Sequence, residues 1–241
     1  MNIERSRITV SGLPVEIVRK AIKNLHLGVY PPNGRVRVAA PVRVPDEAIR
    51  LAVLSRLGWI KRQRRRFRSQ ERQSAREYVS RESHYFLGRR YLLNVIEHDG
   101  PSQVSRRGNK TLELQVPKGA SSLRREMIIL AWYRKNLKAL ILPLIEKWEG
   151  NIGMKVEGWG VRRMKTKWGR CNSADRRIWL NLELAKKPIH CLEYILVHEM
   201  VHLIERKHND RYIALMDHLL PRWRQRRDEL NHAPLAHETW N

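Results

Sequence analysis

Short runs of alternating apolar and polar residues fill the first 41 positions of the chain. The four runs are residues 7–10, 15–20, 25–30 and 35–40. A period of two is typical of strands that bury one face. Gly12-Leu13-Pro14 lies in the first gap and Pro31-Pro32-Asn33-Gly34 in the last, and such clusters favour turns. The pattern predicts two β-hairpins.

A helical period follows these strands. Pro45-Asp46-Glu47 is a favourable helix start, and apolar residues recur from Ile49 to Ile60 with the spacing of one helix face. Beyond Ile60 the chain is basic and polar to about Ser80. The pattern therefore predicts one helix, with an apolar stripe in its first half and basic residues in its second half.

The remainder of the chain mixes both periods, which predicts an α+β fold. The predicted strands are residues 83–87, 90–96, 110–116, 156–165 and 177–182, with a polar loop at residues 98–109. The predicted helices are residues 121–148, a helix from about Pro188, and residues 209–230 with an interruption or kink at Pro221. We expect two domains, at residues 1–80 and 81–241.

Residues 198–202, with the sequence His-Glu-Met-Val-His, carry the most specific chemical signal. Residues four apart share a helix face, so His198 and His202 would offer two nitrogens to one metal ion. Glu199 would then lie beside a water at that ion, where a carboxylate serves as general base. The neighbouring residues are mostly apolar, and buried polar side chains need partners. The pattern predicts a catalytic zinc site.

A catalytic zinc ion usually takes three protein ligands. We choose His208 as the third, six residues after His202. The metzincin pattern has the same spacing, but its glycine is replaced here by Glu205. We therefore expect the helix to run on to about Lys207 and the chain to bend at Asn209-Asp210. The alternatives are Glu205, which is disfavoured because it lies too close on the same helix, and Asp217, His218, Asp228 and Glu229.

The composition adds a second signal, a strong excess of positive charge. The chain has 48 Lys and Arg against 24 Asp and Glu, a formal net charge of +24. The excess is densest in the second half of the basic helix, beside the aromatic residues Trp59 and Phe67. These basic residues are Lys61, Arg62, Arg64, Arg65, Arg66 and Arg68. A polyanion such as nucleic acid is one expected partner, bound through phosphates without sequence preference. An anionic membrane or an acidic protein could use the same charge, and a solvated helix is the remaining alternative.

The same composition bears on compartment and membrane. The chain has no apolar run near the roughly 20 residues that cross a bilayer, and residues 1–14 lack the apolar core of a signal peptide. Cys171 and Cys191 are the two cysteines, too few for a disulfide framework. We expect a cytoplasmic protein without membrane insertion.

The stretch before the metal helix, residues 163–182, reads as an extended segment, a turn and a strand. In a zinc peptidase, an edge strand beside the metal helix can hold an extended substrate through main-chain hydrogen bonds. Trp168, Trp179 and Leu180 fit at least as well as core residues, with Gly169 as a turn. Both interpretations stay open at this point.

Four motifs together resemble those of the YgjP-like metallopeptidases. They are R-x-x-x-x-W-G-x-C from Arg163 to Cys171, I-x-L-N from Ile178 to Asn181, Y-I-L-V-H-E-x-V-H from Tyr194 to His202, and H-x-x-x-Y from His208 to Tyr212. Residues 81–91 resemble the middle segment of that family, although Arg81 stands where glycine is commoner. The likeness covers most of the chain. A more distant likeness is to SprT-type and Wss-type zinc proteases, which act on proteins attached to DNA.

The resemblance implies a zincin-like catalytic domain, with a small antiparallel or mixed sheet, an active-site helix and backing helices. A β-rich region and the basic helix would precede it. It also implies the zinc ligands His198, His202 and His208, with Glu199 as base. Candidate donors to the oxyanion are Tyr212, Tyr194, Arg163 and His218.

The expected function is therefore a zinc-dependent metallopeptidase that acts on a protein or peptide substrate. Two alternatives from other classes remain. One is a metal-dependent nucleotide or phosphoester hydrolase, in which arginines would bind phosphates. The other is a basic nucleic-acid-binding protein that uses zinc only to hold its fold. Glu199 separates them, because a binding protein has no use for a carboxylate beside an open metal.

Overall fold

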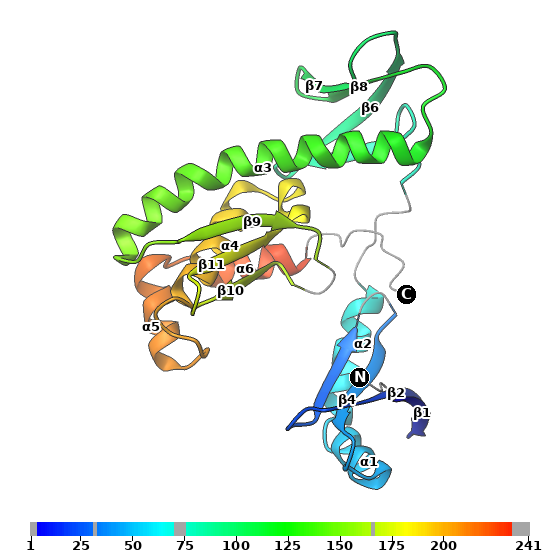
Figure 1. The fold of residues 1–241 in the computed structure, drawn as a ribbon, viewed down its shortest axis with the longest axis vertical. Helices are drawn as coiled ribbons and strands as arrows, with labels where there is room; N and C mark the ends of the chain where they lie inside the picture. The colour runs from blue at the N-terminus through cyan, green and yellow to red at the C-terminus, as the bar shows by residue number, and fades with distance from the viewer. Residues whose placement is uncertain (1–3, 31–32, 70–75, 165–166, 233–241) are drawn as a thin grey trace. The chain divides into compact units, whose positions relative to one another are not determined.

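The computed structural model describes residues 4–30, 33–69, 76–164 and 167–232. It has mixed α and β structure, as expected (Figure 1). Its contacts divide the chain into two compact units, the described residues up to 69 and those from 76 to 232. This division falls near residue 74, and the functional domain boundary at residues 80 and 81 stays a prediction.

The first unit contains a four-stranded sheet built from two hairpins, which confirms that prediction. Strand β1 (Glu4–Val10) pairs with β2 (Leu13–Lys20), and β3 (His26–Tyr30) pairs with β4 (Arg35–Pro41), both antiparallel. Strands β2 and β4 join the hairpins in parallel. Alternate residues of the central strands form the core of this unit, as the period of two predicts.

Two helices, not one, follow this sheet, so the prediction of a single helix is wrong. Helix α1 (Asp46–Leu54) ends before Ser55, and α2 (Leu57–Ser69) begins two residues later. The Ser55 hydroxyl donates to the carbonyl of Ala52, a local bond that competes with regular helix geometry. The predicted continuation crosses residues 70–75, which lie outside the described residues, and residues 76–80 are not helical.

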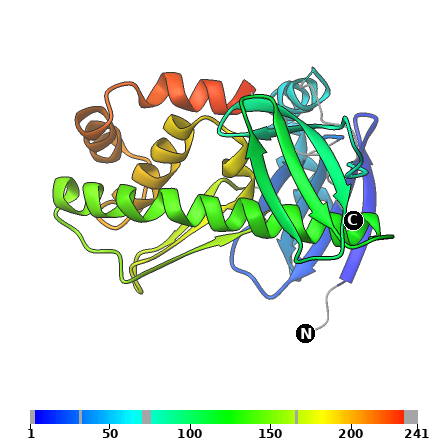
Figure 2. The same cartoon turned by 90° about the horizontal axis from the view of Figure 1, so that it is seen from above.

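The second unit is organised around the long helix α3 (Ser122–Ile152), which runs past two sheets (Figure 1, Figure 2). The first sheet has the order β5-β6-β8-β7. Its strands are β5 (Ser83–Phe86), β6 (Arg89–Glu97), β7 (Gln103–Arg107) and β8 (Thr111–Val116). Strand β7 lies inside the predicted polar loop, so that prediction is wrong. Val104 is its one buried residue, which leaves too little apolar pattern to reveal a strand.

The second sheet carries the segments that lead to the metal helix. Its strands are β9 (Gly158–Arg162), β10 (Gly169–Asn172) and β11 (Arg177–Asn181), in the order β10-β11-β9. Strand β11 pairs in parallel with β9 and antiparallel with β10. Strand β10 is therefore an edge strand with one side free of sheet partners among the described residues.

Helix α4 (Ile189–Val201) packs against β10 and β11 as well as α3. Most of its residues are apolar and buried, which explains why it lies inside the unit. The short helix η1 (Leu182–Lys186) precedes it. Helices α5 (Asp210–Leu219) and α6 (Trp223–His232) follow, separated at Pro221 as predicted, and both contact α4.

A tight turn between β5 and β6 supports the start of α4. Leu87 and Gly88 both have positive φ, as a two-residue hairpin turn requires. Their backbone N–H groups donate to the carbonyls of Ala185 and Lys186 at the end of η1. A Cβ on Gly88 would lie 2.8 Å from Cγ of Pro188, the residue before α4. Glycine thus permits this close approach, which fixes where α4 begins.

Candidate metal centre and active site

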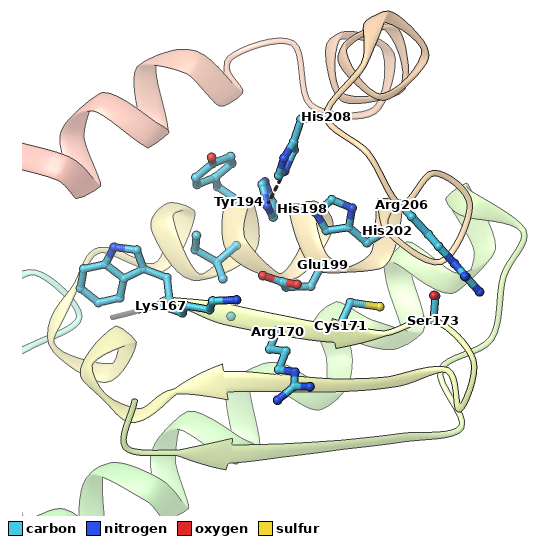
Figure 3. A pocket seen from close by; sticks show the side chains of 13 residues that line it. Lys167, Arg170, Cys171, Ser173, Tyr194, His198, Glu199, His202, Arg206 and His208 are labelled. Carbon is cyan, nitrogen blue, oxygen red and sulfur yellow. Dashed lines mark hydrogen bonds between the residues drawn. The ribbon is translucent and has the colours of Figure 1, made fainter. Parts of the chain in front are cut away.

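Three imidazoles meet at the carboxyl end of α4. His198 lies in the last turn of the helix, His202 caps its end, and His208 reaches them from the loop before α5 (Figure 3). One ring nitrogen of each lies within 4.8 Å of the others. Nε2 of His198 and Nε2 of His208 are 3.3 Å apart. The structure therefore brings together the three predicted ligands.

The path from His202 to His208 differs from the prediction. Helix α4 ends at Val201 and does not run on to Lys207. The N–H groups of Leu203 and Ile204 donate to carbonyls three residues back, which tightens the chain into a turn. Helix α5 then starts at residue 210, where the Asn209 side chain accepts from the N–H of Tyr212. The turn and this cap place His208 beside the helix end without the metzincin glycine.

The spacing of the nitrogens fits a tetrahedral zinc ion. Zn–N bonds of about 2.0–2.1 Å at tetrahedral angles place two ligand nitrogens about 3.3 Å apart. His198 and His208 show that separation with both Nε2 atoms facing each other. Three imidazoles are also the ligand set of zinc hydrolases that keep a fourth position open. These residues therefore fit the ion that the sequence predicts.

Hydrogen bonds on the far side of two rings leave Nε2 available to a metal. Nδ1 of His202 lies 2.9 Å from the carbonyl oxygen of Glu205, which only accepts, so Nδ1 carries the proton. Nδ1 of His198 lies 2.6 Å from the hydroxyl oxygen of Tyr212, and that hydroxyl can donate to the His198 carbonyl at 3.4 Å. Such contacts orient metal ligands and set their tautomers.

The environment also favours the neutral form of His198 and His208, as metal binding requires. Burial, reinforced by His202 and His208, lowers the pKa of His198 to about 3. Burial and the proximity of His202 also lower the pKa of His208 below its usual value. Neutral rings keep a lone pair for an ion at neutral pH.

The carboxylate of Glu199 lies on the strand side of the helix, facing β10 (Figure 3). Its side chain is buried, and burial raises its pKa to about 7, against the opposing effects of Lys167 and of a hydrogen bond from the N–H of Cys171. A Cβ on Gly169 would lie 2.5 Å from Oε1 of Glu199. The edge strand therefore approaches the carboxylate as closely as a glycine allows and donates a backbone hydrogen bond to it.

A cavity of about 580 Å³ opens beside these groups. The three histidines and Glu199 line one part of it, and residues 167–171 with Ser173 line another. Asn181 anchors the loop that leads into this wall, because its Nδ2 donates to the carbonyls of Met164 and Lys167 at 2.8 Å each. The cavity gives a substrate access to the imidazoles and the carboxylate at once.

The competing ligand candidates lie elsewhere or are engaged. Asp217 accepts from Nε1 of Trp223 and pairs with Arg224. Glu229 pairs with His190. Glu205 lies beyond the helix end, not on the helix as predicted. Its backbone carbonyl accepts a hydrogen bond from Nδ1 of His202. Asp228 and His218 do not belong to the histidine cluster of the described residues.

The predicted nucleic-acid residues belong to the first unit, on α2. Lys61, Arg62 and Arg65 are exposed. Arg64 is half-buried, and its Cγ would lie 2.7 Å from a Cβ on Gly34. The side chains of Arg66 and Arg68 lie outside the described residues. Three of these basic residues are therefore exposed, whereas Arg64 packs beside Gly34.

Sequence reasoning missed three contributors to the site. Gly169 was compatible with a simple turn, and its proximity to Glu199 needed the packing of β10 on α4. Tyr212 was a candidate oxyanion donor, but its hydroxyl is engaged by His198. Asn181 was part of a motif without a role. Asparagine as the last residue of a buried strand was the one available signal for an anchoring side chain.

A buried His-Glu-x-x-His helix, a third converging imidazole and an adjoining cavity define the site of a candidate metallohydrolase. The family model for the YgjP-like metallopeptidase domain matches residues 23–233, so the chain belongs to the YgjP-like family. Membership makes the protein a metallopeptidase in general terms and implies a divalent metal and protein or peptide substrates. Comparison with curated proteins finds no significant match. No helix among the described residues is long and apolar enough to cross a bilayer.

Proposed function

We propose that the protein is a zinc-dependent peptidase in which His198, His202 and His208 hold the ion and Glu199 is the general base. One observation carries the proposal: three imidazole nitrogens converge within 4.8 Å next to a cavity that Glu199 also lines. The family supplies the reaction class, and the geometry supports the choice of metal and base. A zincin-like arrangement, with α4 on one face of the three-stranded sheet, belongs to the same proposal.

A bound zinc ion would polarise the scissile carbonyl and make a water molecule acidic enough to attack near neutral pH. Glu199 lies one residue from His198 and faces the cavity, so its carboxylate takes the proton from the attacking water. The same carboxyl then passes this proton to the leaving amine. Gly169 and the N–H of Cys171 hold the carboxylate in place during both transfers.

Strand β10 is the proposed ledge for the substrate. It is the edge of its sheet, and Gly169 to Cys171 line the cavity. An extended peptide that adds to this edge would gain main-chain hydrogen bonds and pass beside Glu199. The geometry thus favours the ledge interpretation of residues 163–182 over a purely structural one.

The variant Glu199→Gln tests the proposal against both alternatives. We expect it to bind one zinc ion per chain with unchanged affinity and unfolding temperature, and to lose peptide cleavage by at least about 100-fold. The measurements are metal analysis, thermal unfolding and cleavage of an unfolded protein by the zinc-loaded chain. Hydrolysis of nucleoside triphosphates without any peptide cleavage by the wild type would favour the phosphoester hydrolase. Zinc without any hydrolysis would favour the binding protein.

A second proposed property is polyanion binding by the first unit, which fits a protein that acts near nucleic acid. Residues 1–73 contain 17 Lys and Arg against 5 Asp and Glu. Lys61, Arg62 and Arg65 are exposed on α2, and Trp59 on the same helix is 37% exposed. Basic groups beside an aromatic surface suit contact with phosphates and stacking of a base.

Replacement of Lys61, Arg62 and Arg65 by Ser tests this property. The logarithm of the nucleic-acid binding constant should fall less steeply with the logarithm of salt concentration, by about 0.9 for each duplex phosphate that the variant no longer neutralises. Arg50→Ser is the matched control, because Arg50 already pairs with Glu47 at 3.0 Å. An unchanged slope in the triple variant would remove the proposal.

The two free cysteines support a reducing compartment such as the cytoplasm for both activities.

A further inference from the structure

The cavity beside the three histidines has an uneven distribution of charge. Its lining includes three basic residues, Lys167, Arg170 and Arg206, and a single carboxylate, Glu199. Figure 3 shows Lys167 on one side of Glu199 and Arg206, near Ser173, on the other. The side chain of Arg170 points away from the histidines in the same view. Two cations therefore flank the proposed reaction centre, one on each side.

These two cations are without ion-pair partners among the described residues. Several other cations of the second unit do pair with carboxylates, for example Arg163 with Glu126 at 3.2 Å, Lys186 with Glu183 at 2.8 Å, and Arg226 with Glu193 at 2.8 Å. Lys167 and Arg206 are exposed and form no ion pair within 4.0 Å among the described residues, although Lys167 is close enough to Glu199 to lower the pKa of that carboxyl group. A ligand with negative charge can therefore reach them without displacing a carboxylate of the protein.

We propose that the cleft selects peptide segments with Asp or Glu on both sides of the cleaved bond, and that Lys167 and Arg206 are the specificity-determining residues. This inference rests on the proposed peptidase function. A peptide extended along β10 would pass Lys167 before and Arg206 after the reaction centre, or in the opposite order. Each carboxylate would gain a charged partner in a cleft that is partly shielded from water.

The charge of the whole chain acts in the same direction. A net charge of +24 raises the local concentration of acidic segments and speeds their association at low salt. This long-range effect does not depend on which cation is near the cleaved bond. Position-dependent selectivity, in contrast, requires Lys167 and Arg206, so the two effects are separable by experiment.

Arg170 provides a matched control within the same wall. It carries the same charge as Arg206 and lies on β10 between Gly169 and Cys171, which face Glu199. Its side chain leaves the opposite face of the strand, because successive side chains of a strand alternate. Arg170→Glu and Arg206→Glu therefore change the net charge equally, but only the second places the new carboxylate on the side of the cavity where the histidines lie.

The test uses zinc-loaded full-length protein and fluorogenic peptides with Asp or Glu on one side, on both sides, or replaced by Asn or Gln. The doubly acidic peptide should have a kcat/KM about tenfold above that of its amide counterpart, from two charge pairs of ordinary strength. Arg206→Glu should abolish the preference on one side of the bond, and Lys167→Glu on the other. Arg206→Glu should also favour Lys at the affected position, whereas Arg170→Glu should leave the ratios unchanged.

A binding measurement keeps the inference testable apart from turnover. Zinc-loaded Glu199→Gln protein should bind the doubly acidic peptide about tenfold more tightly than the amide peptide, and addition of Arg206→Glu should reduce this ratio. If wild type cleaves no peptide but this selectivity is observed, the proposed function is wrong, and the preference of the cleft for acidic peptides is still supported. Equal cleavage or binding of acidic and amide peptides would overturn the inference alone.

A nucleic acid is the other polyanion to test in the same cleft. A single-stranded oligonucleotide is added as a competitor of the acidic peptide. If Arg206→Glu relieves this competition but leaves the acidic-to-amide ratio unchanged, the cation serves phosphates and the inference is wrong. If the ratio falls in this variant, the carboxylate preference is confirmed whether or not the oligonucleotide competes.

Discussion

Helix α4 carries two clusters of potential metal ligands, one near each end. His198, His202 and His208 meet at its carboxyl end, and His190, Cys191 and Glu229 meet at its amino end. Both clusters place three ligand atoms within 4.8 Å of one another. They differ in how these atoms face each other, and this difference separates a metal centre from an ordinary polar contact.

In the amino-end cluster, His190 and Glu229 are hydrogen-bond partners of each other. Nε2 of His190 lies 2.6 Å from Oε2 of Glu229, a complementary pair of a ring nitrogen and a carboxylate. Burial, and to a smaller degree Glu229, raise the pKa of Cys191 to about 11, so its thiol stays protonated and is a poor ligand. This cluster needs no ion.

In the carboxyl-end cluster the facing groups are alike. Two Nε2 atoms point at each other, while Nδ1 of His198 and Nδ1 of His202 are engaged behind the rings by Tyr212 and by the carbonyl of Glu205. Converging nitrogens of neutral imidazoles can be held together by one cation that all three rings coordinate. Proximity of ligand types alone is therefore a weak criterion, and the orientation of their lone pairs is a stronger one.

Removal of His208 should have the largest effect on metal binding by the carboxyl-end cluster. His208→Ala takes away the ligand that comes from outside the helix, and we expect zinc affinity to fall by more than about 100-fold, beyond the usual effect of a residue that only orients a ligand. Competition with a chromophoric chelator measures it. His218→Ala is the control, since His218 is an exposed histidine on α5 outside the cluster. Equal affinities in both variants would return the third ligand to the other candidates.

The variant Gly169→Ala should affect the general base Glu199 without affecting the three histidine ligands. A Cβ at this position would lie 2.5 Å from Oε1 of Glu199, so the carboxylate must move while the histidines stay. We expect kcat to fall by about 100-fold, as for a displacement near 1 Å, with zinc affinity unchanged. Gly150→Ala is the control, because nothing lies within 4 Å of a Cβ there. Full activity in Gly169→Ala would mean that the strand does not position the carboxylate.

These two sites also show how far a sequence can predict structure. The helical spacing of His198 and His202 is local, so their common face was predictable from a stretch of five residues. His208 approaches the other two histidines through the turn after Val201. Its spacing in the sequence predicted this approach, although the predicted end of the helix was wrong. The contact of Gly169 with Glu199 joins residues from a strand and a helix far apart in the chain. No local pattern encodes such a contact.

The fold shows the same limit. Helix α3 was predictable because its apolar residues repeat over many turns, and the strands of the two N-terminal hairpins alternate clearly. Strand β7 was missed because only Val104 marks it, and its pairing with β8 stabilises it instead. The break at Ser55 was missed because an apolar stripe continues across it. Pairing with another strand decided the first case, and the local hydrogen bond of Ser55 to Ala52 accompanies the second.

Tyr212→Phe should weaken, but not abolish, the carboxyl-end cluster. The hydroxyl holds Nδ1 of His198 at 2.6 Å, and removal of such an orienting hydrogen bond typically lowers metal affinity by about 10–100-fold. Chelator competition measures the change. Tyr194→Phe is the control, because the ring of Tyr194 also lies edge-on to His198 but its hydroxyl makes no hydrogen bond to this ring among the described residues. Equal affinities in both variants would mean that the ring of Tyr212, and not its hydroxyl, supports the site.

Disruption of the amino-end cluster should have the smallest effect. His190→Ala removes the pairing with Glu229, in which both side chains are more than a third exposed, so stability should change by no more than about 1 kcal/mol. Zinc should remain at one ion per chain in the wild type and in this variant, because the remaining thiol stays protonated in its buried position. A second bound ion in the wild type that His190→Ala removes would make both ends of α4 metal sites. The orientation of the ligand atoms would then not distinguish a metal centre from an ordinary polar contact.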